Sequence, residues 1–215
     1  MRLGDTAADA LKGVDAAALT MPPAQPGMRI GLFGGSFNPP HEGHLLVAET
    51  ARRRLGLDKV WWMVTPGNPL KDHGKLRPIG ERLAAVRALA PGRHSVPTAF
   101  EARHRIRYSA DTVALLRRRH PGVHFVWIMG ADSLASFHRW QDWQEIATSL
   151  PIAVVDRPGS TLSVLSAVTP QVLARFRLPE TAARALPLRR PPAWVFLHGP
   201  RSTVSSTLLR RQNGD

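Results

Sequence analysis

Apolar residues fall in short blocks along the chain, and the spacing within each block predicts its secondary structure. Compact apolar runs are typical of buried strands, whereas apolar positions three and four residues apart are typical of helices. Strand-like runs lie at 29–33, 59–64, 94–97, 123–129, 152–155 and 194–197. Helical spacing occurs at 43–55, at 81–90, at 109–120 with Ser109 as its predicted cap, and at 205–211.

The order of these blocks predicts the fold class. Strands that alternate with helices over short connections are typical of an α/β protein. We therefore predict a single Rossmann-like, doubly wound domain with a mainly parallel sheet and helices on both faces. Ligands of such sheets bind beyond the carboxyl ends of the strands, so chemistry is expected just after them.

Three stretches show no clear periodicity. Residues 1–27 are rich in Ala, Gly, Pro and Asp, which predicts a flexible N-terminal extension ahead of a domain at 28–215. Residues 65–76 read as a polar loop. The prolines and arginines of 160–192 predict a segment that is partly loop.

Length and composition exclude several classes of protein. The 215 residues suit one domain with a real core, and 43% apolar with 21% charged residues is typical of a globular chain. No apolar run approaches the roughly 20 residues that span a bilayer, and residues 1–27 lack the pattern of a secretory signal. The chain has no cysteine, which excludes disulfides and thiol catalysis and agrees with a cytoplasmic protein.

The net charge of +13 comes from 29 Lys and Arg against 16 Asp and Glu. A basic surface favours anionic partners such as nucleotides, nucleic acid or lipid headgroups. Almost all of the excess is arginine, which genome composition can also produce, so charge alone leaves the partner open.

The first candidate site follows the first predicted strand. Gly34 and Gly35 permit a positive φ and let backbone N–H groups, including those of Ser36 and Phe37, approach an anion. A helix beginning near His41 would add its unpaired N–H groups and the positive end of its dipole. His41 and His44, three residues apart, can project from one side of the first turn and donate to phosphate oxygens. Two ordinary surface histidines are the alternative interpretation.

A second candidate site lies near the C-terminus. Ser205 or Ser206 is a suitable N-cap, and Thr207 and Arg210 share a helix face. A serine-rich helix start with an arginine one turn later predicts a second anion site. Ordinary capping beside a solvated arginine is the alternative.

Both motifs resemble those of a known family. The segment GGSFNPPHEGH at 34–44 is similar to the signature of the HxGH nucleotidyltransferase superfamily, and 202–210 resembles its ISSTxxR element. Over about residues 28–211 the chain resembles bacterial nicotinate-nucleotide adenylyltransferase, although the family usually has Asp where Asn38 stands. The resemblance implies transfer of the adenylyl group of ATP to the 5′-phosphate of nicotinate mononucleotide, with Mg²⁺ and without a covalent intermediate.

The resemblance also implies roles for individual residues. Those implied in catalysis are His41, His44 and Arg210. Those implied in ATP binding are Gly34, Gly35, Ser36, Phe37, His41, His44, Gly130, Asp132, Ser205, Ser206, Thr207 and Arg210. Those implied for the mononucleotide are Ser36, Lys71, Tyr108, Ser109 and Trp140, with no metal ligand from the protein.

Some of these roles have alternatives. Asp132 would contact the adenosine ribose, or cap the next helix, or do both. Trp140 would stack on the pyridine ring, although Trp143 could take that place or either ring could belong to the core. Lys71 could simply be solvated.

Other functions compete with this one. Nicotinamide mononucleotide or phosphopantetheine are alternative acceptors within the superfamily. A basic nucleic-acid-binding protein is another class, but the chain has no helix-turn-helix, RRM or zinc signature, so we expect no nucleic-acid partner. A non-catalytic nucleotide sensor would not need His41, His44 and Arg210 together. The sequence leaves the oligomeric state open.

Overall fold

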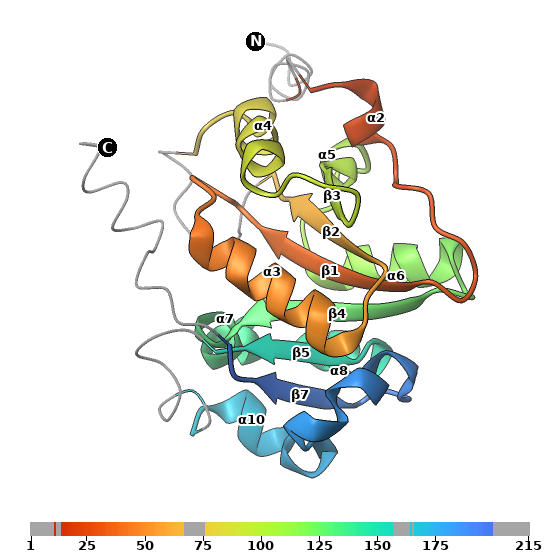
Figure 1. The fold of residues 1–215 in the computed structure, drawn as a ribbon, viewed down its shortest axis with the longest axis vertical. Helices are drawn as coiled ribbons and strands as arrows, with labels where there is room; N and C mark the ends of the chain where they lie inside the picture. Colours follow the sequence, from red (N-terminus) through yellow and green to blue (C-terminus); the bar gives the residue numbers. More distant parts are fainter. Residues whose placement is uncertain (1–10, 12–13, 67–75, 157–163, 165, 200–215) are drawn as a thin grey trace, which may run out of the picture.

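The computed structural model describes residues 11, 14–66, 76–156, 164 and 166–199 (Figure 1). Its centre is a seven-stranded sheet with the order β3-β2-β1-β4-β5-β7-β6, in which all neighbouring strands are parallel. Helices cover both faces, as the predicted doubly wound domain requires. The predicted fold class is confirmed.

The strands match the apolar runs closely. Three runs give strands with the predicted ends, three are displaced by one or two residues, and the two-residue strand β6 was not predicted. The strands are β1 (Arg29–Gly35), β2 (Lys59–Val64), β3 (Ser95–Thr98), β4 (His124–Gly130), β5 (Ile152–Val155), β6 (Arg177–Leu178) and β7 (Trp194–Leu197).

The longer helices also lie where helical spacing predicted them. These are α3 (Glu42–Leu55), α4 (Ile79–Leu89) and α6 (Ser109–Arg119). The cap of α6 was predicted wrongly: Tyr108 is its N-cap and Ser109 its first residue, because the extended backbone ends at Tyr108. The helix predicted at 205–211 lies outside the described residues.

Short helical segments connect the strands and were mostly missed, because segments of three to nine residues are too short to show a clear helical period. They are α2 (Ala16–Leu19), α5 (Phe100–Arg103), α7 (Ala131–Ser136), α8 (Trp143–Ser149) and α10 (Val168–Val172), with the 3₁₀ segments η1 (Phe137–Arg139), η2 (Ala174–Phe176) and η3 (Glu180–Leu188). The described part of 160–192 is thus a series of helical segments around β6.

Alternate residues of each strand serve two separate cores. Phe33 of β1 packs with α3, α4 and η3 on one face, whereas Ile30 and Leu32 pack with α5, α6 and α8 on the other. Figure 1 shows α3 in front of the sheet and α6 and α8 behind it. Burial on both faces explains why the strands read as continuous apolar runs.

Within the extension predicted at 1–27, residues 14–27 lie against the domain, whereas 1–10 and 12–13 lie outside the described residues. Asp15 caps α2, and its carboxylate also pairs with Arg87 of α4 at 2.6 Å. The carbonyl of the buried Ala18 accepts hydrogen bonds from the backbone of Ala99 and the hydroxyl of Thr98. Side chains contribute as well: Val14 and Leu19 pack against the core on the α3 face, and Met21 against the core on the other face. The apolar residues of this segment follow neither a strand nor a helix period, so its packing could not be predicted from spacing.

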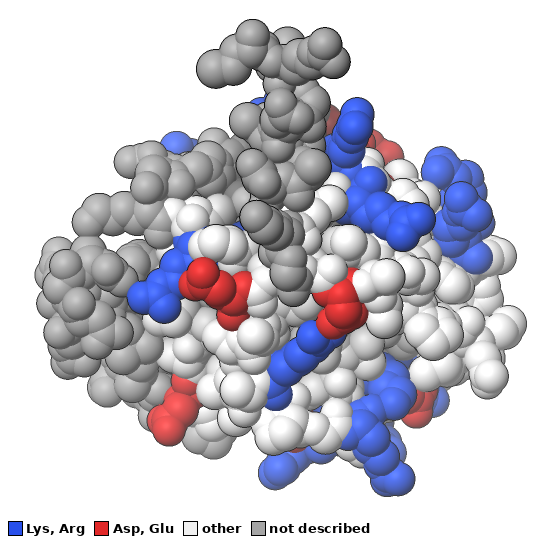
Figure 2. Space-filling model, turned by 90° about the horizontal axis from the view of Figure 1, so that it is seen from above, with Lys and Arg blue, Asp and Glu red and all other residues white. Residues whose placement is uncertain are grey.

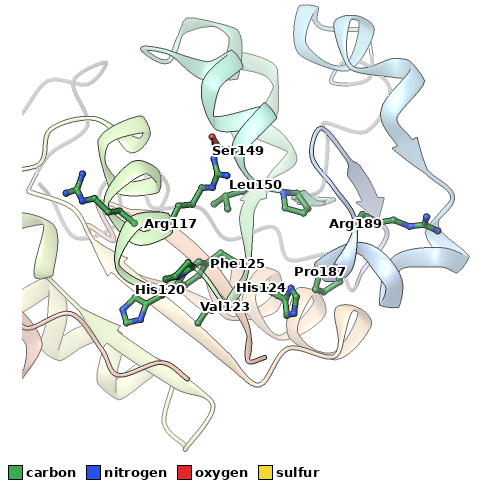
Figure 3. Close-up of a pocket in the computed structure, with 12 residues that line it drawn as sticks. Arg117, His120, Val123, His124, Phe125, Ser149, Leu150, Pro187 and Arg189 are labelled. Carbon is green, nitrogen blue, oxygen red and sulfur yellow. Dashed lines mark hydrogen bonds between the residues drawn. The ribbon is translucent and has the colours of Figure 1, made fainter. Parts of the chain in front are cut away.

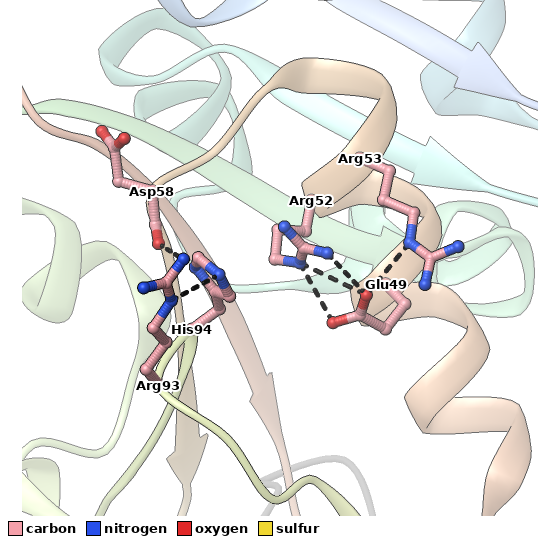
Figure 4. Close-up of polar contacts among 6 residues, drawn as sticks. All are labelled: Glu49, Arg52, Arg53, Asp58, Arg93 and His94. Carbon is pink, nitrogen blue, oxygen red and sulfur yellow. Dashed lines mark hydrogen bonds and ion pairs between the residues drawn. The ribbon is translucent and has the colours of Figure 1, made fainter.

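The surface of α3 is organised by ion pairs. Glu49 accepts from Arg52 at 2.9 Å and pairs with Arg53 at 3.3 Å (Figure 4). Arginines in the last turn also suit the negative end of the helix dipole. Gly56 ends the helix in the left-handed conformation, with φ of 66°.

No helix among the described residues is long and apolar enough to span a membrane.

Candidate active site

The carboxyl ends of β1 and β4 lie side by side at the centre of the sheet. Phe33 of β1 stands opposite Ile128 of β4, and β2 flanks β1 on its other side. The order of the chain reverses between β1 and β4, which is the point where doubly wound sheets bind ligands. The segments that follow β1 and β4 therefore emerge at the same point of the sheet edge.

Residues 36–41 form the connection from β1 to α3, which we call the phosphate turn. Gly34 and Gly35 still belong to β1 and neither has a positive φ, so the predicted conformational role of the two glycines is wrong. Their backbone is held in the strand because Gly35 remains paired with Val64 of β2. The positive φ of 46° occurs two residues later, at Phe37.

Burial of its side chain explains how Phe37 keeps this unfavourable backbone conformation. Phe37 is 1% exposed, and its ring lies 5.5 Å from both Phe33 and Trp62 and 5.1 Å from His44, between centroids. A Cβ atom on Gly35 would lie 3.1 Å from the Phe37 ring. Glycine at position 35 thus makes room for the ring that fixes the turn.

His41 and His44 close the amino end of α3 through reciprocal hydrogen bonds. Nδ1 of His41, the N-cap, accepts the N–H of Gly43 at 3.1 Å, and Nδ1 of His44 accepts the N–H of His41 at 3.2 Å. The ring centroids lie 3.9 Å apart. The prediction that both histidines lie on one side of the first turn is confirmed.

This pattern assigns the tautomer of both rings. Because Nδ1 of His41 and of His44 accepts a hydrogen bond, the hydrogen of each neutral ring is on Nε2. Each ring is therefore a hydrogen-bond donor at a helix N-terminus, where the dipole favours an anion over a cation. The pair is suited to phosphate oxygens.

The residues after β4 supply the other half of this edge. Gly130 ends β4 and is the N-cap of α7, and the exposed Asp132 lies in the first turn. The alternative that Asp132 itself caps the helix is therefore wrong, because β4 extends one residue further than predicted. A contact of Asp132 with ribose stays a prediction.

Three of the residues predicted for the pyridine nucleotide, Tyr108, Ser109 and Trp140, lie on the sheet face opposite α3. Tyr108 and Ser109 begin α6, and Trp140 follows η1. Trp140 lies 6.2 Å from Trp127 and 5.3 Å from Phe137, between ring centroids. Trp140 thus touches β4 itself and is only half-buried, which favours it as an accessible stacking surface.

Sequence reasoning missed a buried carboxyl group beside the start of α6. Glu101 of α5 is 5% exposed and accepts a hydrogen bond from the Thr112 hydroxyl at 2.6 Å. Burial raises the pKa of Glu101 to about 7, although the bond from Thr112 opposes the shift. The bond joins α5 to α6 across the loop that carries Tyr108. The only sign of the buried Glu101 in the sequence is its position directly after the apolar Phe100.

A buried arginine beneath the phosphate turn was also missed. Arg82 of α4 donates to the backbone carbonyls of Ser36, Thr65 and Arg77. Asn38 strengthens the same contact, since its Oδ1 accepts the N–H of Arg77 at 3.2 Å. The signal in the sequence was the place of Arg82 between Ile79, Leu83 and Val86, on the buried face of the helix.

Comparison with known proteins agrees with this geometry. The profile of the Cytidylyltransferase-like family matches residues 32–212. A "Probable nicotinate-nucleotide adenylyltransferase" of Mesorhizobium japonicum is 58% identical over 191 residues, which cover 89% of this chain and 98% of the relative. A protein of the same name from Brucella abortus is 60% identical, over 86% of this chain and 95% of its own.

The chain belongs to the nicotinate-nucleotide adenylyltransferase family. Solved structures support the fold: a Plasmodium falciparum nicotinic acid mononucleotide adenylyltransferase complexed with NaAD has a TM-score of 0.64 at 14% identity. The match covers 86% of this chain and 83% of that one. The same protein complexed with APC has a TM-score of 0.59.

Several residues implied by membership of the nicotinate-nucleotide adenylyltransferase family lie outside the described part of the chain. They are Lys71, Ser205, Ser206, Thr207 and Arg210. Their roles stay predictions.

Basic residues of this adenylyltransferase-family chain are dispersed on the face seen in Figure 2. Lys and Arg side chains stand among acidic and uncharged ones rather than in one continuous patch. A cavity of about 430 Å³ does contain Arg117, His120 and His124, but it lies at the amino ends of β4 and β5 (Figure 3). It therefore opens on the sheet edge opposite the phosphate turn.

Proposed function

We propose that the chain transfers the adenylyl group of ATP to the 5′-phosphate of nicotinate mononucleotide, giving deamido-NAD and pyrophosphate in NAD biosynthesis. The observation that carries the proposal is the pair His41 and His44, which are fixed as Nε2–H donors at the point where the strand order reverses. The names of relatives at 58% and 60% identity support nicotinate mononucleotide as the acceptor.

The reaction is an in-line displacement at the α-phosphorus of ATP. An oxygen of the mononucleotide 5′-phosphate forms the new P–O bond, and the bond to the bridging oxygen breaks as pyrophosphate leaves. The attacking oxygen is already anionic at neutral pH, so no strong base is needed. The chain has to position two polyanions and stabilise the charge that develops on the phosphoryl oxygens.

His44 is the proposed donor to the α-phosphate and the bridging oxygen. His41 and the backbone N–H groups of 35–37 would assist it from the phosphate turn. Arg210 and Lys71 are proposed to neutralise the leaving pyrophosphate. Gly130 and Asp132 would hold the adenosine. The ATP phosphates would be bound by Ser205, Ser206 and Thr207.

Mg²⁺ is the proposed metal, and it would enter with ATP. The described residues contain no group of three or more His, Asp or Glu side chains placed to hold a metal. Mg²⁺ is usually bound mainly by substrate phosphates and water, so it would not need such a group. When bound, Mg²⁺ would neutralise part of the charge on the triphosphate.

The acceptor would bind on the α6 side of β4. Trp140 is proposed to stack on the pyridine ring, with Ser109 and backbone groups near Tyr108 meeting its carboxylate. Ser36 and Lys71 would contact the mononucleotide phosphate. A cysteine-free chain that uses ATP is consistent with the cytoplasm, where we place the reaction.

A substrate panel tests the proposal. The purified protein is given ATP, Mg²⁺ and one of three acceptors: nicotinate mononucleotide, nicotinamide mononucleotide or phosphopantetheine. We expect kcat/KM to be at least about tenfold higher for nicotinate mononucleotide, because a site built for a carboxylate rejects ligands without one. A preference for either other acceptor contradicts the assigned substrate. Salt-sensitive binding of bulk DNA without pyrophosphate release would favour a nucleic-acid-binding protein instead.

A further inference from the structure

Arg82 occupies an unusual place for a charged residue. It lies in the first turns of α4 and is 2% exposed, beside Ile79, Leu83 and Val86 of the same helix. Arginine is rarely buried to this extent unless a partner compensates the charge. The partners of Arg82 therefore indicate why the side chain is there.

The guanidinium joins three backbone segments. Nη1 donates to the carbonyl oxygen of Ser36 at 2.6 Å and to that of Thr65 at 2.9 Å, while Nε donates to that of Arg77 at 2.8 Å. Ser36 opens the phosphate turn, Thr65 follows β2, and Arg77 precedes α4. One side chain thus links the phosphate turn to both ends of the connection between β2 and α4, which a shorter cation cannot do with the same fork of donors.

Among the residues that the structure describes, no carboxylate neutralises the charge of Arg82. Its hydrogen-bond partners are carbonyl groups, and no ion pair joins it to an acid among the described residues. Burial lowers the pKa of Arg82 to about 10, so the group stays protonated near neutral pH. A cation therefore lies directly beneath the turn, where the low dielectric of the interior strengthens its effect on a nearby anion.

We propose that Arg82 is a positioning residue of the active site: it fixes the phosphate turn through Ser36 and adds a positive charge, held by backbone carbonyls, that favours the triphosphate of ATP. The inference rests on the proposed function for the identity of the anion. A buried arginine that only stabilises the fold would be expected to pair with a nearby acid. Apolar residues of similar volume often stabilise a fold equally well at such a position. Because Ser36 is the first residue of the turn, its hydrogen bond with Arg82 helps to fix the backbone N–H donors that follow.

Three variants separate these roles. Arg82→Met keeps an unbranched apolar stem but removes the charge and the donors. Arg82→Lys keeps a charge with fewer donors. Arg87→Met is the matched control, because Arg87 is on the same helix, half-exposed and paired with Asp15. Each variant is assayed for kcat and KM with both substrates, for thermal stability, and for binding of inorganic tripolyphosphate by calorimetry.

We expect Arg82→Met to lower kcat by roughly 10–100-fold, the scale of a small misplacement of catalytic groups, and to weaken tripolyphosphate binding. Arg87→Met should change neither beyond about twofold. Arg82→Met that is folded, with kcat and tripolyphosphate affinity within threefold of the parent protein, would overturn the proposal. Tripolyphosphate binding does not require adenylyl transfer. The effect of Arg82 on anion binding can therefore be measured even if the protein does not catalyse the proposed reaction.

The pH profile of Arg82→Lys tests the charge even if Arg82→Met does not fold. A lysine at this buried position should lose its proton at lower pH than a solvated lysine. We expect kcat/KM of Arg82→Lys to fall between about pH 7.5 and 9.5, with the parent protein unchanged over that range. Identical profiles for the two proteins would show that the charge plays no part and would overturn the electrostatic half of the proposal.

Discussion

The Nδ1 atom of His44 accepts the backbone N–H of His41 at 3.2 Å, so one ring nitrogen closes the helix while Nε2 carries the donor. The two nitrogens of one side chain thus have separable duties. Capping by Nδ1 stabilises α3, and donation by Nε2 is the proposed contribution to adenylyl transfer. Substitutions that mimic one nitrogen or the other can distinguish them.

Replacing His44 should impair catalysis far more than stability. Asn offers an acceptor near the position of Nδ1, so His44→Asn should keep the cap but lose the Nε2 donor. We expect kcat to fall by roughly 10²–10⁴-fold, the range for removing one transition-state donor. His44→Ala should lose the same activity and in addition about 1 kcal/mol of stability through the cap.

Steady-state pyrophosphate release and urea unfolding measure the two effects. His94, which lies outside the phosphate turn and contacts Asp58 and Arg93 (Figure 4), provides the control through His94→Asn. A loss below tenfold in folded His44→Ala would remove His44 from the centre of the mechanism.

The two candidate tryptophans can be distinguished by kinetics. Trp140→Ala should raise KM for nicotinate mononucleotide and leave KM for ATP nearly unchanged, because an aromatic stacking contact contributes about 1 kcal/mol or more. Ser109→Ala should act in the same direction through the carboxylate. Trp143→Ala is the comparison, since its ring touches Phe137 but not Trp127. Equal loss for both substrates in Trp140→Ala would exclude the stacking role.

Glu101 should make folding stability depend on pH. Its pKa of about 7 in the folded chain exceeds the ordinary value of 4.5, so the unfolded carboxyl releases its proton first as pH rises. The contribution of Glu101 is fully present below pH 4.5 and is lost as pH rises through 7. Between pH 5 and 8, Glu101→Gln should therefore gain up to about 3 kcal/mol relative to the parent protein.

Urea unfolding at several pH values measures this difference. Gln can still accept the Thr112 hydroxyl, so the packing at the site is preserved. Glu49→Gln is the control of opposite sign, because the hydrogen bond from Arg52 lowers the pKa of Glu49. Its stabilising contribution is present above pH 4.5 and is lost on acidification. A stability difference for Glu101→Gln that is constant with pH would contradict the assignment.

Two glycines of β1 should respond differently to alanine. A Cβ atom on Gly31 would lie 2.4 Å from Cδ1 of Ile128 and 2.8 Å from that of Leu57, whereas one on Gly34 meets nothing closer than 3.6 Å. We expect Gly31→Ala to lose about 1–3 kcal/mol of stability through overpacking. Gly34→Ala should remain close to the parent protein in thermal unfolding, and equal losses would show that the strand itself resists a side chain.

The strands and longer helices could be predicted because their signal is local. After Lys59, the run VWWMV of β2 is apolar without interruption since both sheet faces are covered, and α3 shows its buried stripe directly. The positions of His41 and His44 followed from the same local spacing. Their tautomer did not, because it depends on backbone N–H groups that only the folded turn orients.

What escaped prediction depends on contacts between distant segments. Arg82 looks like one arginine among many until Ser36 and Thr65, 46 and 17 residues away, are brought to it. The positive φ was expected at the glycines, but burial of the Phe37 ring outweighs intrinsic backbone preference. Residues 14–27 attach through single contacts of irregular spacing, such as the Ala18 carbonyl and the Asp15 carboxylate, which no periodic apolar pattern reveals.

The contact of Ala18 with the end of β3 affects how the edge of the sheet is exposed to other chains. An outer strand presents unpaired N–H and C=O groups, which invite another chain to continue the ladder. Here the N-terminal segment occupies groups at the end of β3, and Pro97 offers no N–H within that strand. The opposite border, β6, is two residues long and is followed by Pro179. Neither border offers a long template, which protects this arginine-rich domain against strand-mediated aggregation.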